Sequence, residues 1–169
     1  GRILTFGEKH AYTYNMRKRI LRLAHADLDE IAATCACFGL RKAARVVTQI
    51  YDEALRPSGL GAAQFNLLVA VALMEAPTIT RLAGVLAMDP TTLLRNLAPL
   101  ARDKLVRVDP GEDRRTRIVT LGEGGATALA RAIPLWRHAQ ARIVEHVGAE
   151  RLPDLSERLA VLTALGGQR

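Results

Sequence analysis

Apolar residues recur at helical spacing over most of the chain. From Asp27, a suitable N-cap, one long helical pattern runs to about Leu55, where Arg-Pro-Ser-Gly forms a strong stop signal. Three further segments have the same periodicity: 62–74, 123–148 with an interruption at Pro134, and 150–165. The pattern therefore predicts a mainly α fold, with β structure confined to one small hairpin.

The stretch from Thr78 to Leu121 has its own pattern. Its segments are, in order, a short helix (78–88), Asp89-Pro90, a second helix from Thr91, a β-like run (106–108), a polar loop (109–116) and a second β-like run (117–121). Helix, tight turn, helix and a hairpin with a basic tip form the layout of a winged helix-turn-helix. That layout places one helix in the major groove of DNA.

The second of these helices has one apolar and one polar face. Leu93, Leu97 and Leu100 fall at i, i+4 and i+7 and form a stripe for the core. The opposite face carries Thr91, Thr92, Arg95, Asn96 and Arg102. Arg can bond guanine, Asn can bond adenine, and a Thr methyl can contact thymine. The face is a candidate DNA reader, although a solvated surface is the commoner origin of such a pattern.

The hairpin loop strengthens the DNA interpretation. Arg114, Arg115 and Arg117 follow the second helix closely, and several cations in one loop suit phosphate or minor-groove contacts. The net charge of +7 adds less, because residues 1–25 hold six Lys or Arg and one Glu. The remaining 144 residues hold 18 basic and 16 acidic groups, so the position of the charges matters more than their sum.

The chain is expected to divide into four parts. They are an N-terminal extension (1–26), a dimerisation helix (27–56), a winged helix-turn-helix DNA-binding domain (57–122) and C-terminal dimerisation helices (123–169). The long apolar helices at both ends have more apolar surface than a small winged domain can cover, which predicts a homodimer with a lobe built from both termini.

Other classes of protein are disfavoured by what the sequence lacks. No Ser-His-Asp or Cys-His arrangement, phosphate-binding Gly loop or His-Glu-x-x-His is present, so we expect neither an enzyme nor a bound cofactor or structural metal. The longest apolar run, 67–74, is too short to span a bilayer, and Cys35 and Cys37 form no disulfide framework. We expect a cytoplasmic protein without a membrane partner. A winged helix that binds only proteins is the alternative, and it predicts an acidic or apolar face on the second helix.

The chain resembles the MarR family of transcriptional regulators over roughly residues 27–165. The matching motifs are Gly59-Leu60-x-x-x-Gln64-Phe65-x-x-Leu68, Thr78-Ile79-x-x-Leu82-Ala83, Met88-Asp89-x-Thr91-Thr92-Leu93-x-Arg95-Asn96-Leu97, Lys104-Leu105-Val106, Asp113-Arg114-Arg115 and Val119-Thr120-Leu121. Three positions depart from the family pattern: Gly61 and Gly122 stand where Thr often caps a helix, and Lys104 stands where Gly is common after the recognition helix.

The resemblance implies a dimeric repressor on palindromic double-stranded DNA, released by a ligand or an oxidant. It implies recognition contacts from Pro90, Thr91, Thr92, Arg95 and Asn96, and wing contacts from Arg114, Arg115 and Arg117. Asp113 in such a wing braces an Arg and does not touch DNA.

The signal is left open by the sequence. Ala36-Cys37-Phe38-x-Leu40 with Tyr51 resembles the peroxide-sensing, OhrR-like branch, in which a helix Cys is oxidised, whereas Ala62 and Arg41 stand where that branch has aromatic residues. Cys37, Cys35 and Tyr51 are thus candidate redox residues, although buried Cys residues are mostly packing groups. Two alternatives are metal binding by Cys35 and Cys37 with His25 or His138, and a small-molecule pocket lined by Tyr51, Phe65, Trp136 and His138.

Overall fold

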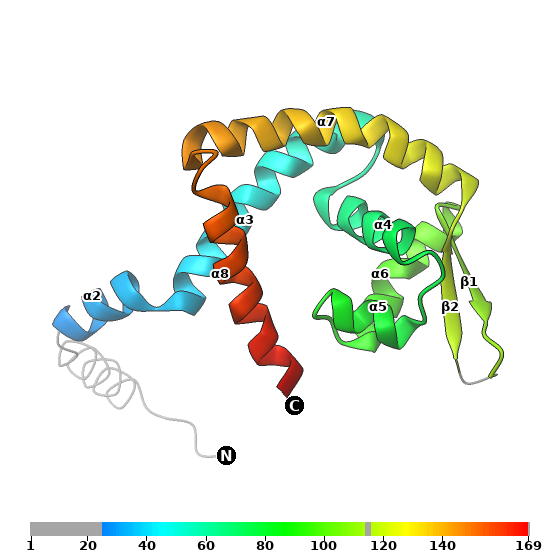
Figure 1. Ribbon diagram of the computed structural model, residues 1–169, viewed down its shortest axis with the longest axis horizontal. Helices are drawn as coiled ribbons and strands as arrows, with labels where there is room; N and C mark the ends of the chain where they lie inside the picture. Colours follow the sequence, from blue (N-terminus) through cyan, green and yellow to red (C-terminus); the bar gives the residue numbers. More distant parts are fainter. Residues whose placement is uncertain (1–24, 114–115, 169) are drawn as a thin grey trace, which may run out of the picture. The chain divides into compact units, whose positions relative to one another are not determined.

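A computed structural model describes residues 25–113 and 116–168 (Figure 1). They belong to two compact units that divide within one helix: the first ends at Val47 and the second begins at Thr48. Most of the expected N-terminal extension, residues 1–24, lies outside the described residues, as do Arg114 and Arg115.

The single long N-terminal helix expected from Asp27 is wrong. The structure has two helices, α2 (His25–Thr34) and α3 (Ala36–Leu55), separated at Cys35. Asp27 lies in the first turn of α2 and is not its N-cap. At the end of α2 the Thr34 hydroxyl donates to the Glu30 carbonyl oxygen at 2.8 Å, a side-chain bond that bends helices and that apolar periodicity does not reveal.

The winged unit follows the expected order. A 3₁₀ turn (Arg56–Ser58) precedes α4 (Ala62–Met74), α5 (Ile79–Val85) and α6 (Pro90–Arg102). A two-stranded antiparallel hairpin comes next, with β1 (Val106–Pro110) pairing β2 (Arg117–Leu121). The expected mainly α fold with a small hairpin is confirmed, and in Figure 1 the hairpin lies beside the cluster of α4, α5 and α6.

The core of this unit is aliphatic and is supplied by every one of its elements. The largest fully buried side chains are Leu55, Leu68, Val71, Pro77, Leu82, Leu93, Leu97, Leu100, Val106 and Val119. The i, i+4, i+7 stripe of α6 is thus buried as predicted. Each fully buried Leu or Val contributes roughly 1.5–3 kcal/mol relative to an exposed one, so α6 is held firmly with its polar face outward.

The hairpin is also tied to the helix-turn-helix. Val106 is opposite Leu121, and Pro110 is opposite Arg117 at the far end. β2 makes an isolated bridge between Ile118 and Thr78, and the Val119 N–H donates to the Pro77 carbonyl oxygen at 2.9 Å. The start of α5 and the wing are therefore positioned together.

The expected interruption at Pro134 is also wrong. Helix α7 runs from Glu123 to Val147 with Pro134 inside it. Pro134 cannot donate to the carbonyl of Ala130, but both residues are exposed, so water can satisfy that carbonyl and the helix continues. Helix α8 (Leu152–Ala164) and a 3₁₀ turn (Leu165–Gln168) follow.

Three helices leave large apolar side chains exposed. Among the side chains described in α2, α3 and α8, Leu55 alone is buried. The exposed ones include Leu28, Ile31, Phe38, Leu40, Val46 and Val47 in the first unit and Leu155, Leu159, Val161 and Leu162 in α8.

Within the described parts of the chain, none of the helices taken singly has the length and apolar character that a membrane crossing needs. One bent pair, Ala36–Ser58 with Ala62–Met74, passes the same test by length and composition only.

Candidate nucleic-acid interface

Helix α6 begins with the cap that the sequence predicts. Asp89 has extended backbone angles, and its carboxylate oxygen accepts from the amide N–H of Thr91 at 2.9 Å and of Thr92 at 3.1 Å. Pro90 occupies the first helical position, where no N–H is needed. The first turn is therefore fixed locally, and so are the residues that it presents.

The outer face of α6 carries the predicted recognition residues. Thr91 and Arg95 are exposed, whereas Thr92 and Asn96 are half-buried. Arg102, also on this face, has its guanidinium 3.1 Å from the Asp103 carboxylate. Arg95 has no such ion pair among the described residues, so its guanidinium is available to a ligand.

The turn before α6 is tight. Thr78 is the N-cap of α5, and its hydroxyl accepts from the Arg81 N–H at 3.2 Å; the helix ends at Val85. Ala87 then has a φ of 49°, in the left-handed region, and Met88 N–H donates to the Ala83 carbonyl oxygen at 2.9 Å. This turn leads the chain directly into the Asp89 cap.

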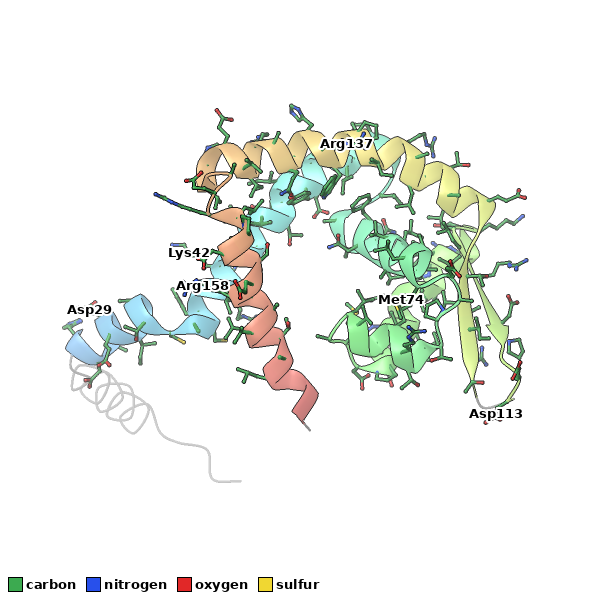
Figure 2. The ribbon with its side chains drawn as sticks, in the orientation of Figure 1. Asp29, Lys42, Met74, Asp113, Arg137 and Arg158 are labelled. Atoms are coloured by element: carbon green, nitrogen blue, oxygen red, sulfur yellow. The ribbon has the colours of Figure 1, made fainter. Side chains whose placement is uncertain are left out.

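The wing presents Arg117 and its loop on the same unit. Arg117 is exposed at the start of β2. The loop is closed by Thr116, whose N–H and hydroxyl both donate to the Asp113 carbonyl oxygen, at 2.8 and 2.7 Å. Figure 2 shows Asp113 at the tip of the hairpin. The contacts expected of Arg114 and Arg115 lie outside the described residues, so the bracing role of Asp113 stays a prediction.

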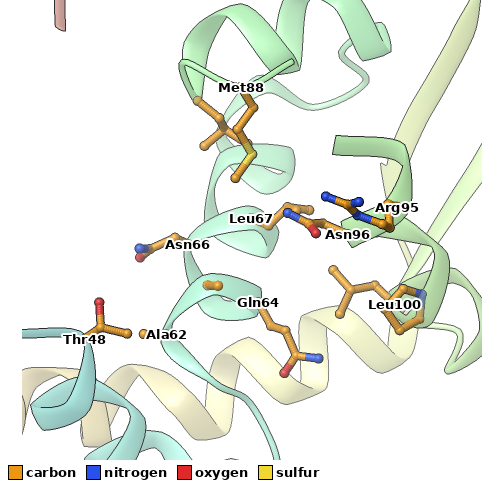
Figure 3. Close-up of a pocket in the computed structure, with 12 residues that line it drawn as sticks. Thr48, Ala62, Gln64, Asn66, Leu67, Met88, Arg95, Asn96 and Leu100 are labelled. Atoms are coloured by element: carbon orange, nitrogen blue, oxygen red, sulfur yellow. The ribbon is translucent and has the colours of Figure 1, made fainter. Parts of the chain in front are cut away.

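A pocket of about 490 Å³ lies between α4 and α6 (Figure 3). Its walls are mostly apolar, and the single charged side chain among its lining residues is Arg95. The lining residues are Thr48, Ala62, Ala63, Gln64, Asn66, Leu67, Leu86, Met88, Arg95, Asn96, Pro99 and Leu100. Two expected DNA-contacting residues thus also line a cavity, which the sequence interpretation missed.

The small-molecule pocket expected from the sequence is not this one. Phe65 is buried in the core, and Tyr51 and Trp136 pack against it half-buried. His138 is exposed on α7. The pocket instead uses Ala62, Ala63 and Leu67, which share one face of α4. Their helical spacing is the signal that could have found it.

The redox candidates lie apart within one protomer. Cys35 is half-buried at the break between α2 and α3, Cys37 is exposed, and both are free thiols. Tyr51 is fourteen residues beyond Cys37 on α3, about 21 Å at the helical rise. Its hydroxyl donates to Gln140 of α7, and burial raises the pKa of this phenol above its usual value.

Among the described residues, the metal alternative has no candidate site within one protomer. Over residues 25–113 and 116–168, no three His, Cys, Asp or Glu side chains gather where they could share an ion.

Comparisons with solved structures find a likeness to DNA-binding regulators. The chain is 41% identical to the transcriptional regulator MosR of M. tuberculosis in complex with DNA, with a TM-score of 0.72 over 79% of this chain and 96% of MosR. Two further structures share the fold. A point mutant of E. coli MarR with operator DNA has a TM-score of 0.71 and 22% identity, over 79% of this chain and 96% of that one. The repressor CouR on a 23-mer DNA duplex has a TM-score of 0.70 and 24% identity, over 83% of this chain and 98% of that one. No family sequence model and no curated protein matches the chain.

Proposed function

Since this chain belongs to the MarR family of winged helix-turn-helix transcriptional regulators, we propose that it is a homodimeric repressor that reads a palindromic operator. The observation that carries the proposal is α6. Its leucine stripe is buried, its first turn is capped, and Thr91, Arg95 and Asn96 lie on its outer face. MosR, the relative with 41% identity, is solved on DNA.

The DNA contacts follow from the chemistry of these side chains. α6 enters the major groove, where Arg95 bonds a guanine, Asn96 an adenine, and the Thr91 and Thr92 methyl groups contact thymine. Pro90 and the first turn face the phosphates. Arg114, Arg115 and Arg117 of the wing contact the backbone or the adjacent minor groove.

The dimer is supported by α2, α3 and α8. These helices leave large apolar side chains in water, a surface that a monomer rarely keeps and that marks an interface. Two copies related by a twofold axis carry two α6 helices to half-sites about one helical turn apart, which accounts for a palindromic operator.

The signal is a small molecule or an oxidant. The pocket between α4 and α6 has apolar walls and one cation, Arg95, which suits an apolar molecule with an acidic group. Such a ligand would bind Arg95 and so compete with DNA for the same side chain. Oxidation would act on Cys37, the exposed thiol, or on Cys35.

The test is operator binding by the purified protein. DNA from its own upstream region is titrated at two salt concentrations, with and without an organic hydroperoxide, alongside Cys35→Ser and Cys37→Ser variants. Specific binding should weaken as salt rises, because Lys and Arg release counterions from phosphates. If peroxide releases the operator, dithiothreitol restores binding and Cys37→Ser abolishes the effect of peroxide, the thiol switch is established.

The other outcomes are equally decisive. Specific binding that is indifferent to peroxide would assign the signal to the pocket, where Leu67→Trp should fill the cavity and prevent release by a ligand. An absence of specific binding at either salt concentration would overturn the repressor and favour a protein-interaction module.

A further inference from the structure

Helix α4 begins without a side chain of its own to cap it. Its N-cap, Gly61, has extended backbone angles and no side-chain hydrogen bond. The Gly61 N–H donates to the Gln64 side-chain oxygen at 3.0 Å, which completes half of a capping box. The other half, an acceptor for the first-turn amides, must come from elsewhere in the chain.

Asp52 of α3 supplies this acceptor. Its carboxylate oxygen Oδ1 accepts from the Ala62 N–H at 2.6 Å, across ten residues of sequence. A Cβ built at Gly61 would lie 3.2 Å from Asp52 Oδ1, so a larger residue at position 61 would require the carboxylate to shift by a few tenths of an ångström. Asp52 thus caps the first amide of α4 from a neighbouring helix, whereas a Thr or Ser at position 61 would accept locally from the second or third amide.

The capped turn faces the recognition helix. Ala62, Ala63 and Gln64 line one wall of the pocket whose other wall includes Arg95 and Asn96 (Figure 3). Asp52 is thus separated from the DNA-reading side chains by a single turn of α4. Its neighbour Tyr51 bonds Gln140 of α7, so the end of α3 is tied to two helices by consecutive residues.

We propose that Asp52 is a positioning residue for DNA binding. It joins the dimerisation helix α3 to the first turn of α4, which forms the pocket wall opposite Arg95 and Asn96 of α6. This inference rests on the proposed DNA-binding function. It goes beyond stability, because a local cap would stabilise α4 equally well without fixing α4 to α3.

Three variants separate positioning from capping. Asp52→Ala removes the acceptor, and its operator binding should fall about fivefold with a lower melting temperature. Asp52→Asn keeps a side-chain oxygen at the same place and should restore both properties. The double variant Asp52→Ala/Gly61→Ser installs a local cap where the carboxylate no longer obstructs the Cβ. It should regain the melting temperature while its operator binding stays weak.

Glu53→Ala is the matched control. It removes an exposed carboxylate one residue further along α3, has no part in the cap, and should leave both properties unchanged. Hydrogen exchange of the free proteins gives a readout that needs no DNA. In the double variant the second and third amides of α4 should gain protection from the new hydroxyl, whereas the amides of α6 should exchange faster.

The outcomes distinguish this inference from the proposed function. If the double variant recovers operator binding and α6 protection together, Asp52 is only a cap and the inference is overturned. An Asp52→Ala variant that behaves as the wild type does would overturn it as well. If the wild type fails to bind any operator, the proposed function fails, and the exchange of α6 still decides whether Asp52 positions it.

Discussion

Arg95 has two roles open to it at one place on the surface. It is exposed on the outer face of α6, where a guanidinium can fork onto a guanine, and it lines the pocket against α4. Arg102, seven residues later on the same helix, is held in an ion pair with Asp103. The two arginines carry the same charge and differ in their partners, which makes them a matched pair.

Arg95→Ala should weaken operator binding by roughly 1–3 kcal/mol and relax the preference at one base pair, because a bidentate base contact is lost. Arg102→Ala should lower the affinity less than Arg95→Ala does, and by about the same amount for every DNA sequence. The measurement is competition binding against operators substituted one base pair at a time. Equal losses on operator and unrelated DNA for Arg95→Ala would show that it contacts only phosphates.

Two departures from the family pattern, Lys104 and Gly122, lie next to each other in the structure. Lys104 has a φ of 58°, a left-handed conformation that Gly adopts more readily. Its carbonyl oxygen would lie 2.5 Å from a Cβ built at Gly122. A Thr cap is therefore excluded at position 122 by the backbone of position 104, a reason that neither residue reveals in the sequence.

At the scale of elements, α3 is joined to α7 through Tyr51. The phenol is half-buried and donates to Gln140, and burial raises its pKa above the usual value for a tyrosine. A raised folded-state pKa means that the folded protein holds the phenol proton more tightly than the unfolded chain does. The stability that this contributes is complete below pH ~10 and is lost as the pH rises through the folded value.

Tyr51→Phe should therefore remove part of the loss of stability in alkali. Urea denaturation between about pH 8 and about pH 11 measures the free energy of unfolding of both proteins. The variant should be less stable at the lower pH, where the bond to Gln140 is missing, and should lose less as the pH rises. Parallel pH profiles would mean that the phenol has the same pKa in the folded protein as in the unfolded chain.

At the scale of the whole molecule, the apolar surface of α2, α3 and α8 is the dominant feature. Phe38 is 54% exposed and Ile31 is 55% exposed. Burying such a side chain completely contributes roughly 1.5–3 kcal/mol relative to leaving it fully exposed, so covering several of them would favour the proposed dimer. The winged unit has its own exposed residue, Leu73, at 80%, outside these helices.

Phe38→Glu should shift the protein towards monomers, because it places a charge in the proposed interface. Its operator affinity should fall with it, since two linked α6 helices bind more tightly than one. Leu73→Glu, which alters an exposed apolar residue of α4, should leave the mass unchanged. Sedimentation equilibrium measures the mass of both variants. A Phe38→Glu protein that stays dimeric would mean that the interface lies elsewhere.

The winged helix-turn-helix could be predicted because its signals are local. Asp89-Pro90, the leucine spacing of α6 and the two β-like runs of the hairpin are each short, local signals, and the structure has the predicted helix start and buried stripe. The helix predictions that were wrong concern where a helix is interrupted. Helix α2 ends at Thr34 through a side-chain bond to Glu30, whereas α7 passes Pro134 because water can reach the freed carbonyl.

The sequence by itself determined which segments form helices, where α6 starts and which of its faces carries Arg95 and Asn96, because those features depend on neighbours within two turns. Only the tertiary structure decided that Asp52 caps α4, that Gly122 must lack a Cβ and that Arg95 lines a pocket. Each of these depends on the distance between atoms of separate segments. Periodicity within one segment carries no information about that distance.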